Sequence, residues 1–165
     1  MPLYSEAIDA LGTNDSVLRA RLLARLAQNL VVTERDRRHA LSAEAVDIAR
    51  RVGDRFGLAD VLHARVNAIN DPTTLAERLA LNAELETLAD DLGSLELRSR
   101  ATLQRADTLL ESGDPIGAAR ALTRSEELRS QSRIPSMIHW VRVARAGWSL
   151  MCGSSDAEQQ ALAAF

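Results

Sequence analysis

The sequence predicts an all-α protein in which antiparallel helix pairs stack into a right-handed α-solenoid. The first observation is a repeat, since LSAEAVDIARRVGD at residues 41–54 returns 40 positions later as LNAELETLADDLGS at residues 81–94. The second is the helical spacing of apolar residues, and the third is a set of turn residues at the expected helix ends. A fixed period of about 20–50 residues is typical of repeat proteins, and helical patterning indicates stacked helix pairs.

Each expected helix is a stretch of apolar residues at helical spacing that stops at a turn signal. A lone helix over residues 3–11 ends at Gly12 and comes before the first pair. After it we expect eight further helices and no strand: 15–31 with 35–52, 55–70 with 72–92, 95–111 with 114–131, and 135–152 with the shorter pattern 155–165.

Short polar residues and glycines mark the ends of these helices. Gly53 suits the left-handed residue that closes a helix. At Asp71-Pro72, an aspartate cap is followed by a proline at the first helical position, and Thr74 with Glu77 offers an alternative capping box. The expected N-caps are one of Asn14, Asp15 and Ser16, then Asp54, Asp71 and Asp114.

We expect one solenoid domain over residues 1–165, cut from a longer array. Its units lie near 14–53, 54–93, 94–133 and 134–165, which makes about three and a half helix pairs. The helix expected over 135–152 is apolar nearly all round, and the last helical pattern stops short at the end of the sequence. Isolated chains should therefore pair through this end, and sedimentation would detect the dimer. The residues expected to make that contact are Trp140, Val143, Trp148 and Met151.

Composition excludes several classes of protein. Hydrophobic residues make up 46% of the 165 and charged residues 26%, which excludes a disordered chain. A net charge of -3 gives no general attraction to nucleic acid or anionic lipid, so we expect neither direct nucleic-acid binding nor membrane association. The single cysteine, Cys152, excludes an internal disulfide, and no signal peptide is apparent, so the cytoplasm is the expected location.

The sequence contains no arrangement of residues that indicates catalysis or metal binding. His39, His63 and His139 lie in different units, and none has a second His or Cys one helical turn away. Cys152 has no neighbouring base and is expected to be a buried, inert thiol. We therefore expect a protein that is not an enzyme and that uses no metal or cofactor.

One column of arginines has two interpretations. Residues at the same offset of all four units are Arg25, Arg65, Arg105 and Arg145. In the first interpretation these side chains lie on apolar surface and pair with carboxylates of neighbouring helices, with Glu44 and Glu84 as the repeating candidates. In the second they line the concave face and attract a carboxylate, a phosphate or an acidic peptide.

A second candidate is the polar pair His63 and Asn67. The matching column holds Leu23, Leu103 and Val143, so a polar residue at position 63 is unusual. Because a buried polar group without a partner costs about 1–3 kcal/mol, these two side chains should face water, a binding groove or each other.

The helix-pair phrases DSVLRARLLARLA, RRHALSAEAVDIARRVGD and LAERLALNAELETLADDLG resemble tetratricopeptide-like domains of large bacterial signal-transduction ATPases, including regulators related to the maltotriose-responsive transcription activator. The resemblance implies a non-enzymatic protein-interaction or sensory scaffold segment of a transcriptional or signalling regulator. Its partner would be a protein, a peptide or another domain of the same regulator. The alternative is a sensor that binds a small anionic molecule in its concave groove. No phosphate-binding loop or helix-turn-helix is present in these residues, so ATP and DNA binding are not implied.

Overall fold

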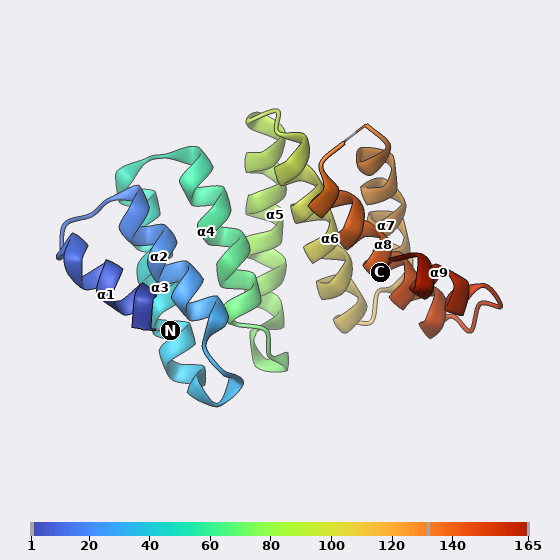
Figure 1. Cartoon of the computed structure of the whole chain (residues 1–165), viewed down its shortest axis with the longest axis horizontal. Coiled ribbons are helices and arrows are strands. Elements are labelled where there is room, and N and C mark those ends of the chain that lie inside the picture. Colours follow the sequence, from blue (N-terminus) through green and yellow to red (C-terminus); the bar gives the residue numbers. More distant parts are fainter. Residues whose placement is uncertain (1, 132, 165) are drawn as a thin grey trace. The chain divides into compact units, whose positions relative to one another are not determined.

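The computed structural model describes residues 2–131 and 133–164, and within these ranges every regular element is helical. Nine α-helices and two short 3-10 helices are described, with no strand among them, which confirms the all-α prediction. Contacts divide the chain into two compact units, an N-terminal unit, Met1–Leu92, and a C-terminal unit, Gly93–Phe165 (Figure 1). None of the described helices is long and apolar enough to cross a membrane.

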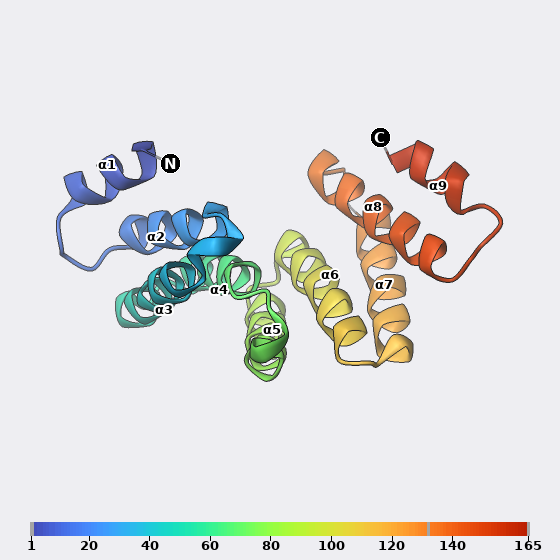
Figure 2. The same ribbon diagram turned by 90° about the horizontal axis from the view of Figure 1, so that it is seen from below.

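The N-terminal unit packs its helices in sequence order. Helix α2 contacts both α3 and α4, α3 contacts α4, and α4 contacts α5. Figure 2 shows α2 lying between α1 and α3. The helices are α1 (Pro2–Leu11), α2 (Val17–Asn29), α3 (Arg35–Val52), α4 (Arg55–Ala68) and α5 (Leu75–Asp91), with the 3-10 turns η1 (Val32–Glu34) and η2 (Pro72–Thr74) before α3 and α5.

The C-terminal unit contains four helices: α6 (Leu95–Glu111), α7 (Pro115–Ser130), α8 (Pro135–Met151) and α9 (Ala157–Ala164). Helices α6 and α7 form a closely packed pair, and so do α8 and α9. Helix α8 also contacts α6 and α7, so it lies between α7 and α9 (Figure 2). The strongly apolar helix expected over 135–152 thus has neighbours on several sides.

The sequence repeat is also a packing repeat in the N-terminal unit. Positions 45 and 85, 48 and 88, and 49 and 89 are buried hydrophobic residues on α3 and α5. The small polar residues Ser42 and Asn82, also 40 positions apart, are fully buried. Burying a large side chain such as Ile48, Leu85 or Leu88 stabilises a fold by ~1.5–3 kcal/mol, so these positions favour burial of the same helix face in α3 and α5.

Capping confirms most of the expected helix starts. The Ser16 hydroxyl accepts from the backbone N–H of Arg19 at 3.1 Å, and the carboxylates of Asp54 and Asp114 accept from backbone N–H groups three residues later at 2.9 and 2.8 Å. Gly53 closes α3 with φ of 76°, a left-handed conformation that favours glycine.

The helix expected over 72–92 differs at its start. Asp71 caps a 3-10 turn, and the α-helix begins only at Leu75. Thr74 does not form the alternative capping box with Glu77, because its hydroxyl donates to the carbonyl oxygens of Ile69 and Asp71.

Three other helices have a start or an end that differs from the expectation by two residues. Helix α2 ends at Asn29 rather than at residue 31, since Leu30 adopts an extended conformation, and α4 ends at Ala68 rather than at residue 70. The last helix begins at Ala157 rather than at residue 155. Residue 165, where the expected last helix and domain end, lies outside the described residues, as do residues 1 and 132.

Candidate anion-binding site

Arg65 of the predicted arginine column is held inside the N-terminal unit. Its guanidinium donates to Glu77 Oε1 on α5 at 2.9 and 2.6 Å, and to the Ser42 hydroxyl at 2.9 Å and the His39 carbonyl at 3.2 Å on α3. Only 13% of the side chain is exposed. Arg65 therefore joins three helices, as the interpretation with carboxylate partners predicts, although its partner is Glu77.

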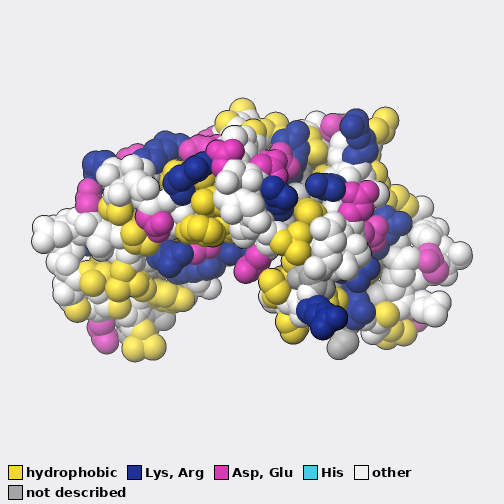
Figure 3. All heavy atoms as spheres, turned by 90° about the horizontal axis from the view of Figure 1, so that it is seen from above, with side chains coloured by type: hydrophobic (Ala, Val, Ile, Leu, Met, Phe, Trp, Pro, Cys, Tyr) yellow, Lys and Arg dark blue, Asp and Glu magenta, His cyan; other side chains and the backbone are white. Residues whose placement is uncertain are grey.

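Glu44 and Glu84, the expected carboxylate partners, pair with arginines outside the column. Their partners lie on different helices, since Glu44 pairs with Arg19 of α2 and Glu84 with Arg50 of α3. Basic and acidic side chains lie interspersed over the N-terminal unit on the face shown in Figure 3. The ion pairs that join its helices include Arg19–Glu44 at 2.7 Å, Arg21–Asp60 at 2.8 Å, Arg50–Glu84 at 2.8 Å and Arg55–Asp91 at 2.6 Å.

The remaining arginines of the column have different surroundings. Arg25 on α2 is half-buried and donates to Gln28 Oε1 of the same helix at 3.2 Å. Arg105 on α6 is half-buried, and Arg145 on α8 lies 3.6 Å from Glu126 Oε1 on α7 with 42% of its side chain exposed. The column therefore does not have one structural role.

The His63 and Asn67 side chains lie half-buried on α4 and face each other. Asn67 Nδ2 lies 3.4 Å from His63 Nε2 and donates to the His63 carbonyl at 3.2 Å, and Arg38 donates to the Asn67 carbonyl at 3.1 Å. One of the expected environments for this pair, contact with each other, is thus present.

The four residues expected to mediate self-association do not share one environment. Trp140 and Met151 are exposed at 60% and 63%, whereas Val143 is half-buried. Trp148 packs against the buried cluster of Ala106, Ala121 and Leu122, which belongs to its own unit. Self-association itself stays a prediction.

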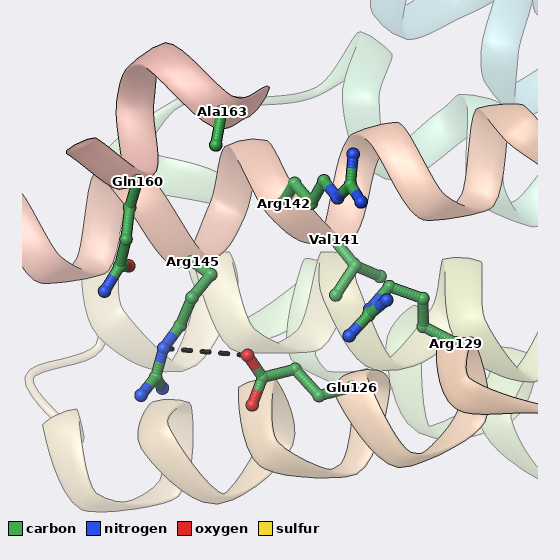
Figure 4. Close-up of a pocket in the computed structure, with 7 residues that line it drawn as sticks. All are labelled: Glu126, Arg129, Val141, Arg142, Arg145, Gln160 and Ala163. Atoms are coloured by element: carbon green, nitrogen blue, oxygen red, sulfur yellow. Dashed lines mark ion pairs between the residues drawn. The ribbon is translucent and has the colours of Figure 1, made fainter. Parts of the chain in front are cut away.

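An open hollow of about 490 Å³ lies between α7, α8 and α9 within the C-terminal unit (Figure 4). Helix α8 contributes the predicted residue Arg145. The other lining residues were not singled out from the sequence. The full lining is Glu126 and Arg129 from α7, Val141, Arg142 and Arg145 from α8, and Gln160 and Ala163 from α9.

Two of these arginines flank one carboxylate. Figure 4 shows Arg145 and Arg129 extending toward Glu126 from opposite sides, whereas the guanidinium of Arg142 extends along α8 away from Arg145. The distance of 3.6 Å between Arg145 Nε and Glu126 Oε1 is an ion pair without a short hydrogen bond. Helix α7 therefore supplies both a cation and the only lining anion.

Two consecutive side-chain hydrogen bonds hold the α9 side of the hollow in place. Ser149 of α8 donates to Gln160 Oε1 at 2.7 Å, and Gln160 Nε2 donates to Asp156 Oδ2 at 2.5 Å. The hydrogen bond from the Ser154 hydroxyl is the main cause that holds the pKa of Asp156 below its ordinary value, and Gln160 and Arg145 lower it further. These hydrogen bonds orient the Gln160 amide beside the hollow and keep Asp156 ionised.

The lining carries three guanidinium groups and one carboxylate, so its formal charge is +2. Arginine stays protonated throughout the physiological pH range, and its planar group binds carboxylate or phosphate through paired hydrogen bonds. The chemistry that this arrangement supports is the binding of an anionic group.

Within the described residues, the histidines, the cysteine and the carboxylates do not come together as a metal site. No group of three His, Cys, Asp or Glu side chains that could hold a metal ion occurs in residues 2–131 and 133–164. His39 Nε2 lies 3.2 Å from Asp71 Oδ2, and His139 Nδ1 lies 3.1 Å from the Ala164 carbonyl oxygen. Cys152 is exposed, so the expectation of a buried thiol is wrong, because the residue lies at the end of α8 where the chain turns to α9.

The hollow could have been suspected from one sequence feature. Glu126 and Arg129, and likewise Arg142 and Arg145, are spaced three apart, which places each pair on one face of its helix. Sequence alone does not show that these two faces and α9 meet around one space. No protein-family model matches this chain, and comparisons with curated proteins and with solved structures also give no match.

Proposed function

We propose that the chain is a non-enzymatic binding segment of a larger cytoplasmic regulatory protein, and that its C-terminal unit binds an anionic ligand. The observation that carries the proposal is the concentration of three arginines around one hollow with a single carboxylate. Pockets of about 300–1,000 Å³ are typical of small-molecule sites, and the hollow of about 490 Å³ falls in that range.

The helix-pair phrases of the sequence, which resemble tetratricopeptide-like domains of bacterial regulators, give this site a setting. A tetratricopeptide-like solenoid, extended beyond these residues in a bacterial regulator, would use its helix pairs as a rigid support for ligand contacts. The buried repeat positions of α3 and α5 support such a packing scheme. In this role, ligand binding between α7, α8 and α9 would change how the segment contacts other parts of the regulator.

A second candidate function is docking of a protein partner. Large apolar side chains are exposed on α8 and α9, and exposed apolar residues that form one patch are typical of an interaction surface. Those residues are Trp140, Leu150, Met151 and Leu162.

The test is isothermal titration calorimetry with glutarate, inorganic phosphate and a hexapeptide of Asp and Glu. The double variant Arg129→Gln/Arg145→Gln should lose at least about tenfold in affinity for each probe that binds, since it removes the two guanidinium groups that flank Glu126. Arg120→Gln/Arg124→Gln is the matched control, because both residues are exposed on α7 and neither lines the hollow. If no probe binds, or if the control loses as much affinity as the test variant, the proposal is refuted.

A further inference from the structure

The cationic groups of the hollow are spread along its length. Arg129 reaches it from the C-terminal half of α7, and Arg145 from α8 on the other side of Glu126 (Figure 4). Glu126 lies between them in this view, and its Oε1 is 3.6 Å from Arg145 Nε, so an anionic group that meets Arg145 lies apart from one that meets Arg129. A ligand that uses both arginines therefore needs two anionic groups with a spacer between them.

The wall of the hollow supplies an apolar surface for such a spacer. Val141 is buried on α8, and Ala163 belongs to the α9 side, so two hydrocarbon side chains line the space together with the arginines. A short chain of methylene groups can pack there without leaving a buried polar group unpaired.

The charge around the hollow gives the sign of the ligand's charge. Three guanidinium groups and one carboxylate leave a formal charge of +2 on the lining, and the ionised Asp156 that Gln160 contacts lowers the local sum to +1, so the hollow attracts an anion. Glu126 adds selectivity, because its negative charge repels every anion. An anion that contacts both arginines offsets this repulsion better than one that contacts a single arginine.

We infer that the ligand of this site is a small organic dicarboxylate whose two carboxylates are separated by a short hydrocarbon chain and bind Arg145 and Arg129 on either side of Glu126. This inference rests on the proposed function and names its ligand class. The Gln160 amide keeps one N–H beyond the bond that it donates to Asp156, and it serves as an additional neutral donor at the α9 side.

The test compares four probes on the unaltered chain by calorimetry: glutarate as the separated dianion, inorganic phosphate as a compact dianion, butyrate as a monoanion, and the acidic hexapeptide. Glutarate should bind at least about tenfold more tightly than butyrate and phosphate, because only glutarate contacts both arginines. If butyrate or phosphate binds as tightly as glutarate, the inference is overturned while anion binding stands. If only the hexapeptide binds, the inference is also overturned. If none of them binds, both proposals fail.

Three variants locate the ligand. Arg129→Gln and Arg145→Gln should each weaken glutarate by about tenfold and leave it as weak as butyrate, whereas Arg120→Gln on the same helix as Arg129 should change it less than about twofold. Glu126→Gln should strengthen glutarate and reduce its preference over butyrate, since the repulsion is removed. Weaker glutarate binding by Glu126→Gln would overturn the assignment. Circular dichroism checks that each variant is folded, and the probe comparison on the unaltered chain decides the matter if one is not.

Discussion

Replacing Arg65 with Gln should destabilise the N-terminal unit by about 2–3 kcal/mol. Its guanidinium makes four hydrogen bonds, two to Glu77 and one each to the Ser42 hydroxyl and the His39 carbonyl. Glu77 is 44% exposed, so water replaces part of that ion pair, and we assign it only about 1 kcal/mol. The two contacts on the α3 side are shielded, and charge-assisted bonds of this kind contribute about 0.5–1 kcal/mol each after allowance for a shorter Gln.

The assay is urea and thermal unfolding followed by far-ultraviolet circular dichroism. A loss of this size lowers the melting temperature by roughly 4–12 °C in a chain of this length. Arg25→Gln is the matched control, because Arg25 occupies the same offset one repeat earlier and, within residues 2–131 and 133–164, its side chain bonds only to Gln28 of its own helix at 3.2 Å. Its cost should stay below about 0.5 kcal/mol.

A double-mutant cycle separates the ion pair from the other contacts. Glu77→Gln combined with Arg65→Gln should cost less than the sum of the two single variants by about 1 kcal/mol. If Arg65→Gln is no more destabilising than Arg25→Gln, Arg65 does not stabilise the packing of α3, α4 and α5. The interpretation of the column as a binding surface would then be preferred for Arg65.

Two other predictions concern a carboxylate and a pair of glycines. The Thr73 hydroxyl is the main cause that lowers the pKa of Asp71 from 3.8, and the Thr73 N–H, Arg35 and His39 lower it further. A lowered folded-state pKa means that the contribution of Asp71 to stability is present at neutral pH and is lost as pH falls through 3.8 toward that lower value. In urea titrations, Asp71→Asn should therefore be less stable than the unaltered chain by a constant amount above about pH 5, and the difference should shrink below about pH 4; a difference that does not change with pH would contradict this. Gly53→Ala should destabilise by about 1–2 kcal/mol because φ is 76°, whereas Gly147→Ala within α8 should stabilise by about 0.5–1 kcal/mol, since nothing lies within 4 Å of the added methyl group at either position. The same sign for both would show that backbone conformation does not decide the effect.

Local signals in the sequence were sufficient to predict most helix ends. An aspartate at position 54 or 114 can cap a helix without help from the rest of the fold, and the structure shows both bonds. The repeated apolar positions indicated the buried face of α3 and α5 for the same reason, since spacing along one helix determines which side chains share a face.

Features that depend on packing between helices were not predictable in this way. Glu77 suited a capping box with Thr74, but its carboxylate pairs with Arg65, which a neighbouring helix brings within reach. The hollow likewise depends on how α9 packs against α8, because Gln160 lies beside Arg145 only after the chain has turned back. Position 152 was expected to be buried from its apolar surroundings in sequence, whereas the turn leaves it in solvent.

The exposed position of Cys152 makes the chain convenient to label. It is the only cysteine of the sequence and lies at the turn that connects α8 with α9, two of the three helices around the hollow. A maleimide fluorophore therefore attaches at one position without any mutation, within the unit that contains the arginines. The emission of the fluorophore depends on the mobility of that turn. Fluorescence measured while an anion is added therefore shows whether the anion tightens the packing of α9 against α8.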